Sequence, residues 1–347
     1  MPPARHRRTA RPAIAALALA GAASLLLVAC TSHSDFAAAA GRRDLATIPA
    51  RLALALPTDA APVSCTAVAA GAPARPLALD LSFRDDFDQL DLGRKDGWLP
   101  HFNLDRDPAT GAWRGYDLAT NRTLVGNHEQ QIYVDPGYAA GSGQPLGLDP
   151  FRIDHGVLSI VAERVRPEHA AALHGFDFSS GMLSSRASFV QRYGYFEMRA
   201  RVPAGRALWP AFWLLPTERV WPPEIDVLEV VGQKPDLMVT TVHASDAPGG
   251  KHRGSGCRTH LPDATENFHL FGALWTPARI TWYIDRRPVA EIATPAGFDR
   301  PMYLLLNLAV GGSMVGRADI YTPTPARFEI DWVAAWKLAD AEMAAGR

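Results

Sequence analysis

Three acidic side chains, Glu224, Asp226 and Glu229, lie within an otherwise apolar, β-branched stretch at residues 223–231. Its alternation predicts a buried strand, in which unpaired charges are costly. A regular strand would place Glu224 and Asp226 on one face and Glu229 on the other. A β-bulge would restore the parity, and bulges are frequent beside active sites. We therefore predict a bulged strand with all three acids on one face; the alternative is a solvated acidic edge strand.

Three acids on one face suit the cleavage of glycosidic bonds. One carboxyl protonates the departing oxygen, while a second attacks the anomeric carbon or activates water. Glu224 and Glu229 would supply these two roles. Asp226, between them, would hydrogen-bond to one of them and keep its ionisation apart from that of the other.

Aromatic residues flank the acidic stretch. Trp209 and Trp213 share one face of the preceding apolar run, where two indoles could form a platform for a pyranose ring. Core packing is the alternative for either indole. Trp221, three residues before Glu224 and followed by two prolines, is expected to line a cleft.

A second polar stripe occurs upstream. Asn127, Glu129, Gln131 and Tyr133 recur at period two, which predicts one face of a strand. Amide and carboxylate groups together donate and accept hydrogen bonds, as sugar hydroxyls do. The stripe is therefore either a sugar-binding surface or an exposed strand face.

Several motifs follow one another in a specific order. They are Tyr193–Arg201, Gly205–Leu214, Glu224–Gly232, Thr241–His243, Phe268–Pro277, Ile280–Asp285, Leu304–Gly312 and Ile330–Trp336. In order and spacing they resemble glycoside hydrolase family sixteen, in particular its laminarinase-like β-1,3-glucanase branch with the bulged Glu-x-Asp-x-x-Glu motif. The resemblance extends over roughly residues 81–338.

The resemblance implies an all-β fold, a β-jelly-roll sandwich of two antiparallel sheets with an open concave cleft, in a catalytic domain at residues 77–340. It also implies an endo-acting, retaining hydrolase of β-1,3-glucan or mixed-linkage β-glucan. By position, Glu224 matches the nucleophile, Asp226 its supporting acid and Glu229 the general acid/base. A carbohydrate-binding lipoprotein or a transglycosylase using the same cleft are the alternatives.

The resemblance also suggests binding residues. Asn127 and Glu129 match the family's Asn-x-Glu-x-Gln-x-Tyr strand on the glycone side, and we expect them to bind substrate. His243 matches a histidine that contacts substrate, although a satisfied core histidine is the alternative. Asp86 and Asp331 fall where family members often hold a structural calcium ion. No cofactor is expected to be required, and we expect a monomer.

The N-terminus has the pattern of an export signal. Basic residues precede an apolar stretch from Ile14 to Val28, which is short for a membrane span. We predict a signal peptide at residues 1–29. The segment before Cys30 resembles a bacterial lipobox, which predicts lipidation of Cys30 and an Ala/Pro-rich tether at residues 30–76. The expected location is the bacterial cell envelope, periplasmic or outer surface, or secretion; an ordinary signal peptide or an uncleaved anchor is the alternative.

Charge and cysteine content restrict the partners. The chain carries 35 basic and 36 acidic residues, for a formal net charge of −1, whereas a nucleic-acid surface needs a basic field. We therefore expect a polysaccharide substrate and no nucleic-acid partner, with membrane contact only through the lipid anchor. In an oxidising compartment, Cys65 and Cys257 are a candidate disulfide.

Overall fold

The computed structural model describes residues 47–93, 97–102, 119–218, 220–246 and 250–339. These residues form strands and loops, with single-turn 3-10 helices η2 (Ala119–Asn121), η3 (Val125–Asn127) and η4 (Pro167–His169). In the described part of the chain, no helix is long and apolar enough to cross a membrane. The predicted signal peptide and Cys30 lie outside the described residues.

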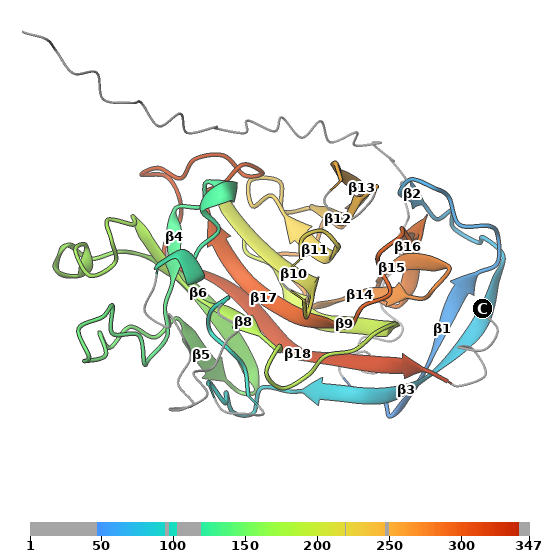
Figure 1. Cartoon of the computed structure of the whole chain (residues 1–347), viewed down its shortest axis with the longest axis horizontal. Helices are drawn as coiled ribbons and strands as arrows, with labels where there is room; N and C mark the ends of the chain where they lie inside the picture. The colour runs from blue at the N-terminus through green and yellow to red at the C-terminus, as the bar shows by residue number, and fades with distance from the viewer. Residues whose placement is uncertain (1–46, 94–96, 103–118, 219, 247–249, 340–347) are drawn as a thin grey trace, which may run out of the picture.

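The described strands form two sheets (Figure 1). The larger sheet contains, in spatial order, β2 (Thr66–Ala67), β16 (Arg287–Ala293), β15 (Arg279–Ile284), β14 (His269–Trp275), β9 (Gly194–Arg201), β18 (Ala326–Leu338), β6 (Val157–Arg164), β7 (Phe178–Ser180) and β4 (Gln131–Tyr133). Three further strands attach to it: β5 (Phe151–Asp154) pairs with β6, β3 (Ala74–Asp85) pairs with β18, and β1 (Arg51–Pro57) pairs with β3. The smaller sheet contains β13 (His252–His260), β12 (Leu237–Ser245), β11 (Glu224–Val230), β10 (Leu208–Pro216), β17 (Met302–Val310) and β8 (Met182–Ser184).

The core lies between the two sheets. Phe212, Ile225 and Leu228 of the smaller sheet are buried in one cluster with Phe196 and Trp282 of the larger sheet. Burying each such side chain stabilises the fold by about 1.5–3 kcal/mol, so this packing decides which residues of β11 face away from the core. The predicted two-sheet sandwich is confirmed, with one parallel pair, β4 and β7, among antiparallel neighbours.

The predicted tether at residues 30–76 is wrong in its later part, because this part belongs to the folded domain. Leu52, Leu54 and Leu56 alternate along β1 as buried residues. They join a cluster that includes Trp336 of β18, on the side of the larger sheet away from the main core. The period-two leucines thus cover an apolar surface that would otherwise face water, and the domain begins well before residue 77.

A disulfide joins Cys65 to Cys257, with the two Cα atoms 5.7 Å apart. Both residues are buried. The pairing agrees with the candidate disulfide predicted from the sequence. Cys257 lies in strand β13 at the edge of the smaller sheet, and Cys65 directly precedes β2 of the larger sheet. The disulfide therefore links the edges of the two sheets.

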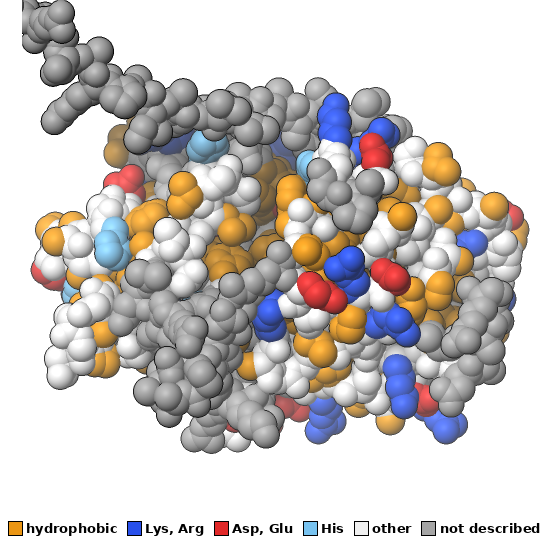
Figure 2. Space-filling model, in the orientation of Figure 1, with side chains coloured by type: hydrophobic (Ala, Val, Ile, Leu, Met, Phe, Trp, Pro, Cys, Tyr) orange, Lys and Arg blue, Asp and Glu red, His pale blue; other side chains and the backbone are white. Residues whose placement is uncertain are grey.

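The surface carries charges of both signs. On the face seen in Figure 2, basic and acidic side chains are interspersed. Ion pairs also join neighbouring strands, such as Arg51 with Asp80 at 3.3 Å and Arg201 with Glu329 at 2.6 Å. An exposed pair such as Arg51 with Asp80 contributes little to stability, so apolar packing dominates.

Candidate active site

Strand β11 contains the predicted bulge. Asp226 pairs with Thr241 of β12, and Glu229 pairs with Val239, so two residues of β11 stand opposite one residue of β12. The pairing with β10 shifts at the same point. Val227, within the bulge, is buried in the core. The extra residue restores the parity, and Glu229 lies on the same face as Glu224 and Asp226, as predicted.

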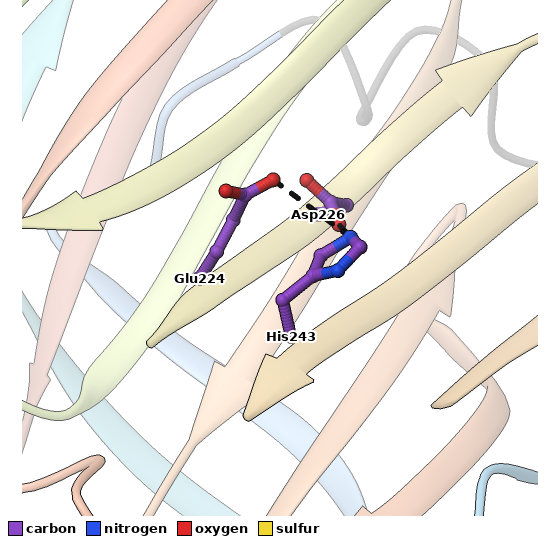
Figure 3. Close-up of side chains that lie close together, drawn as sticks. All are labelled: Glu224, Asp226 and His243. Carbon is purple, nitrogen blue, oxygen red and sulfur yellow. Dashed lines mark ion pairs between the residues drawn. The ribbon is translucent and has the colours of Figure 1, made fainter. Parts of the chain in front are cut away.

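His243 meets two of the acids from the neighbouring strand (Figure 3). It pairs with Glu224 in the register of β11 and β12. Its Nε2 atom lies 3.2 Å from Oδ2 of Asp226 and 3.9 Å from Oε1 of Glu224. Asp226 is only 2 % exposed. The predicted contact of His243 with substrate is thus compatible with its position, but its direct neighbours are the acids.

Two indoles hold the two glutamates. Nε1 of Trp221 donates a hydrogen bond to Oε2 of Glu224 at 2.6 Å. Nε1 of Trp209 donates to Oε1 of Glu229 at 3.0 Å. Trp221 is also 55 % exposed, so its ring is available at the edge of the site. Both tryptophans therefore lie beside the acids, where they orient the carboxylates.

Trp213 does not form the expected open platform. Its indole is 7 % exposed and packs in a cluster with Tyr133, Met182 and Tyr303. Its Nε1 atom donates a hydrogen bond to Oδ1 of Asn307 at 2.7 Å. The side chains of neighbouring strands cover the ring, and Trp213 therefore forms part of the floor beneath the site. Asn307 is a further site residue, and an amide within an otherwise apolar strand is the sequence signal that marks it.

Burial governs the ionisation of the acids. It raises the pKa of Glu224 to about 8, and the charge of neighbouring Asp226 adds to the rise. Burial also raises the pKa of Glu229 to about 7, although His243 opposes the rise. The pKa of Asp226 lies well above its usual range because of burial and the charge of Glu229. The cluster therefore retains protons at neutral pH, which suits general acid catalysis.

The polar stripe is less regular than predicted. The strand begins only at Gln131, because Asn127 ends η3 and His128 adopts a left-handed conformation with φ of 59°. Oε2 of Glu129 accepts hydrogen bonds from Nε2 of Gln131 at 2.6 Å and from the backbone of Leu124 at 3.2 Å. Nδ2 of Asn127 donates to Oε1 of Glu129 at 3.4 Å. Internal hydrogen bonds thus fix Glu129 in place.

Glu129 also lines an open cavity of about 620 Å³. Phe176, Asp177 and Arg317 contribute to its walls. An aromatic ring among polar side chains suits a sugar, which has apolar faces and polar edges. The structure therefore places Glu129 at a surface that can take a sugar unit, even though the strand ends earlier than predicted.

His252 is a site residue that the sequence did not reveal. Its Nε2 atom lies 2.8 Å from Nδ1 of His243, and the two rings stack with centroids 5.0 Å apart. The ring of Trp221 lies 4.6 Å from that of His252. The three rings form one wall of the site, which arises from the register of β12 and β13 and leaves no periodic signal in the sequence.

The two aspartates proposed for calcium each lie beside an arginine. Asp331 is paired with Arg199, and the carboxylate of Asp86 lies 4.0 Å from Arg84. Calcium takes six to eight oxygen ligands. Among the described residues, the only grouping of three metal-binding side chains is formed by Glu224, Asp226 and His243. The calcium site at Asp86 and Asp331 therefore stays a prediction.

Two known proteins are similar to this chain in sequence. The chain is 40% identical over 270 residues to the endo-1,3-1,4-beta-glycanase EglC of Rhizobium meliloti (strain 1021), an alignment that covers 76% of this chain and 54% of the relative. It is 32% identical over 261 residues to a beta-glucanase of Rhodothermus marinus, covering 69% of this chain and 84% of the relative. The chain thus spans about half the length of EglC.

A solved structure shares the fold. The laminarinase catalytic domain of Thermotoga maritima MSB8 superimposes with a TM-score of 0.59 at 26% identity, covering 76% of this chain and 99% of that domain. This similarity confirms the predicted β-jelly-roll sandwich. The sequence model of the glycosyl hydrolases family 16 matches residues 152–334, which include the bulged strand and His243. The chain therefore belongs to the glycosyl hydrolases family 16.

Proposed function

We propose that the chain is an endo-acting, retaining glycoside hydrolase that cleaves β-1,3-glucan or mixed-linkage β-glucan. The observation that carries this proposal is the convergence of Glu224, Asp226 and Glu229 on one face of β11 through the bulge. Buried acids with raised pKa values are costly to a fold, and glycosidic cleavage uses them. Two relatives, an endo-1,3-1,4-beta-glycanase and a beta-glucanase, support the substrate class.

The proposed mechanism has two steps. Protonated Glu229 donates its proton to the glycosidic oxygen while ionised Glu224 attacks the anomeric carbon, and the bond to the leaving sugar breaks. Ionised Glu229 then takes a proton from water, whose oxygen attacks the same carbon and releases Glu224. Nearby His243 and the Trp221 hydrogen bond favour the ionised form of Glu224, but burial and the charge of Asp226 outweigh them and raise its pKa to about 8. Neither step needs a cofactor.

Substrate contacts are proposed at both flanks of the acids. Exposed Trp221 offers an apolar ring to a sugar on one flank. Asn127 and Glu129 offer hydrogen bonds next to the cavity on the other flank. Trp209 and Trp213 would act through the groups that they orient, namely Glu229 and Asn307.

Replacing Glu224 by Gln tests the assignment. We expect turnover of laminarin and lichenan to fall below detection, because an amide cannot form the glycosyl ester, while oligosaccharide binding persists. Glu229→Gln should lower kcat by about 10²–10⁴-fold, the usual contribution of a general acid. Glu163→Gln is the matched control, because Glu163 is an exposed residue of β6 in the larger sheet. This variant should turn over both glucans at the wild-type rate.

Three outcomes would contradict the proposal. Near-normal turnover by Glu224→Gln would remove the nucleophile assignment. Glucan binding by the wild-type chain without any product would favour a carbohydrate-binding protein. Products longer than the starting oligosaccharides would indicate a transglycosylase, in which a sugar rather than water completes the second step.

We also propose that the chain is exported as a monomeric, lipid-anchored protein of the cell envelope. The apolar N-terminal stretch and the lipobox-like segment before Cys30 support this location. A disulfide between Cys65 and Cys257 fits an oxidising compartment. Cys30→Ser should abolish incorporation of labelled fatty acid and release the protein from the membrane fraction. Labelling that persists in this variant would contradict the anchor.

A further inference from the structure

We propose that Glu224, Asp226 and His243 form a binding site for a divalent transition-metal ion of the zinc class, and that the bound ion inhibits hydrolysis. Figure 3 shows the three side chains directed toward one another from two adjacent strands. The binding site stands on the geometry alone. The inhibition rests on the proposed function, because it requires Glu224 to be the nucleophile.

The ligand atoms have the separation that one ion requires. One ligand atom from each side chain lies within 4.8 Å of the other two. Zinc bonds of about 2.0–2.1 Å in a tetrahedral arrangement place ligand atoms roughly 3.3 Å apart. Nε2 of His243 is already 3.2 Å from Asp226 and 3.9 Å from Glu224. A small rotation of the Glu224 side chain would close the remaining gap.

Asp226 supplies an independent observation. Its Oδ2 atom is buried and accepts no hydrogen bond from any described residue, although Nε2 of His243 lies close to it. A buried carboxylate oxygen without a hydrogen bond is costly. A cation between Oδ2 and Nε2 would satisfy both atoms at once.

His252 contacts the ring nitrogen of His243 that lies away from the two carboxylates. Metal-binding histidines usually hydrogen-bond through their second ring nitrogen, which fixes the tautomer and the ring orientation. Nδ1 of His243 makes such a contact with Nε2 of His252 at 2.8 Å. When His243 is the donor in this bond, the lone pair of its Nε2 atom points toward Asp226 and is free to bind a metal.

The ligand set selects the class of ion. Calcium and magnesium prefer oxygen ligands, and calcium takes six to eight of them. One imidazole with two carboxylates suits zinc and neighbouring transition metals. Three protein ligands leave one tetrahedral position for water.

A bound ion would compete with the glucan. Coordination would engage the carboxylate of Glu224, which would no longer be available to attack the anomeric carbon. The ion would also occupy the space beside Asp226 where the sugar reacts. Zinc should therefore raise the apparent KM for laminarin, and laminarin oligosaccharides should weaken zinc binding.

Calorimetric titration of the full chain with zinc chloride tests the site. We expect His243→Asn and Glu224→Gln each to weaken the tightest binding event at least tenfold. His260→Asn is the matched control, because His260 also contacts a carboxylate, that of Asp236 at 2.9 Å, but lies exposed and outside the grouping of three. Its affinity should equal that of the wild type. Thermal unfolding verifies that each variant is folded.

The results separate the two proposals. Zinc affinity that is unchanged in both folded variants, or absent in the wild-type chain, would overturn the metal site whatever the enzyme hydrolyses. Zinc binding that depends on His243 in a chain without glucanase activity would uphold the site and overturn the proposed function. Binding that leaves laminarin hydrolysis unaffected would overturn the inhibition.

Discussion

Glu224 and Glu229 have different roles in the proposed reaction, although burial raises the pKa of both. The proposed mechanism needs Glu224 ionised and Glu229 protonated at the same time. Because the pKa of Glu224, about 8, exceeds that of Glu229, about 7, this combination is the less populated of the two singly protonated forms, and it reaches its maximum between those two pH values. The acids are close enough to titrate together, so the pKa values read from a pH profile belong to the whole cluster and not to single residues.

The first prediction concerns this profile. For the wild-type chain in buffer with a chelator, kcat/KM for laminarin should be bell-shaped with its maximum between about pH 7 and 8. It falls on the alkaline side because Glu229 loses its proton. In Glu229→Gln, residual cleavage of an aryl glycoside, whose leaving group needs no proton, should lack that alkaline fall. An unchanged alkaline limb in the variant would show that another group donates the proton.

The second prediction concerns stability. Because the folded state raises the pKa of Glu224 from 4.5 to about 8, its protonated form favours folding. That contribution is complete below about pH 4.5 and is lost as the pH rises through about 8. Glu224→Gln removes the dependence, so the variant should gain about 5 °C in Tm relative to wild type at pH 8 and little at pH 4.5. Equal Tm differences at both pH values would contradict the raised pKa.

At the scale of elements, the sequence specified strand β11 more fully than its surroundings. Alternating apolar residues revealed the strand, and the parity of Glu224 and Glu229 revealed the bulge. The wall formed by His252 was not predictable, because it depends on the register between β12 and β13, which long-range pairing sets. The choice between platform and core for Trp213 stayed open for a similar reason, since its cover comes from other strands.

The third prediction addresses the disulfide that holds β13. Cys65 and Cys257 are 192 residues apart in the sequence, so their disulfide closes a long loop and constrains the unfolded chain. The Cys65→Ser/Cys257→Ser variant should therefore lose about 2–4 kcal/mol of unfolding free energy. Because β13 also carries His252, the variant should show a higher KM for laminarin near its unfolding temperature. Denaturant unfolding measures the first effect. A stability equal to that of the wild type would mean that strand pairing alone holds this edge.

At the scale of the whole molecule, the fold class followed from the order of the motifs, but the start of the domain did not. Alanine and proline dominate residues 30–76 and suggested a tether. Three leucines at period two are a short signal, and their burial depends on an apolar surface formed by β18, far away in the sequence. The Ala/Pro-rich composition therefore suggested a tether, whereas the period-two leucines belong to a strand whose burial only the tertiary structure reveals.

The last prediction tests where the domain begins. A chain starting at Leu77 lacks Leu52, Leu54 and Leu56, each of which contributes about 1.5–3 kcal/mol when buried. Their sum is comparable with the 5–15 kcal/mol that stabilises a typical domain. The shorter chain should therefore be insoluble or largely unfolded, whereas a chain starting at Thr47 should retain wild-type Tm and glucanase activity. If both chains unfold at the same temperature, β1 merely rests on the larger sheet, and the predicted tether would be restored.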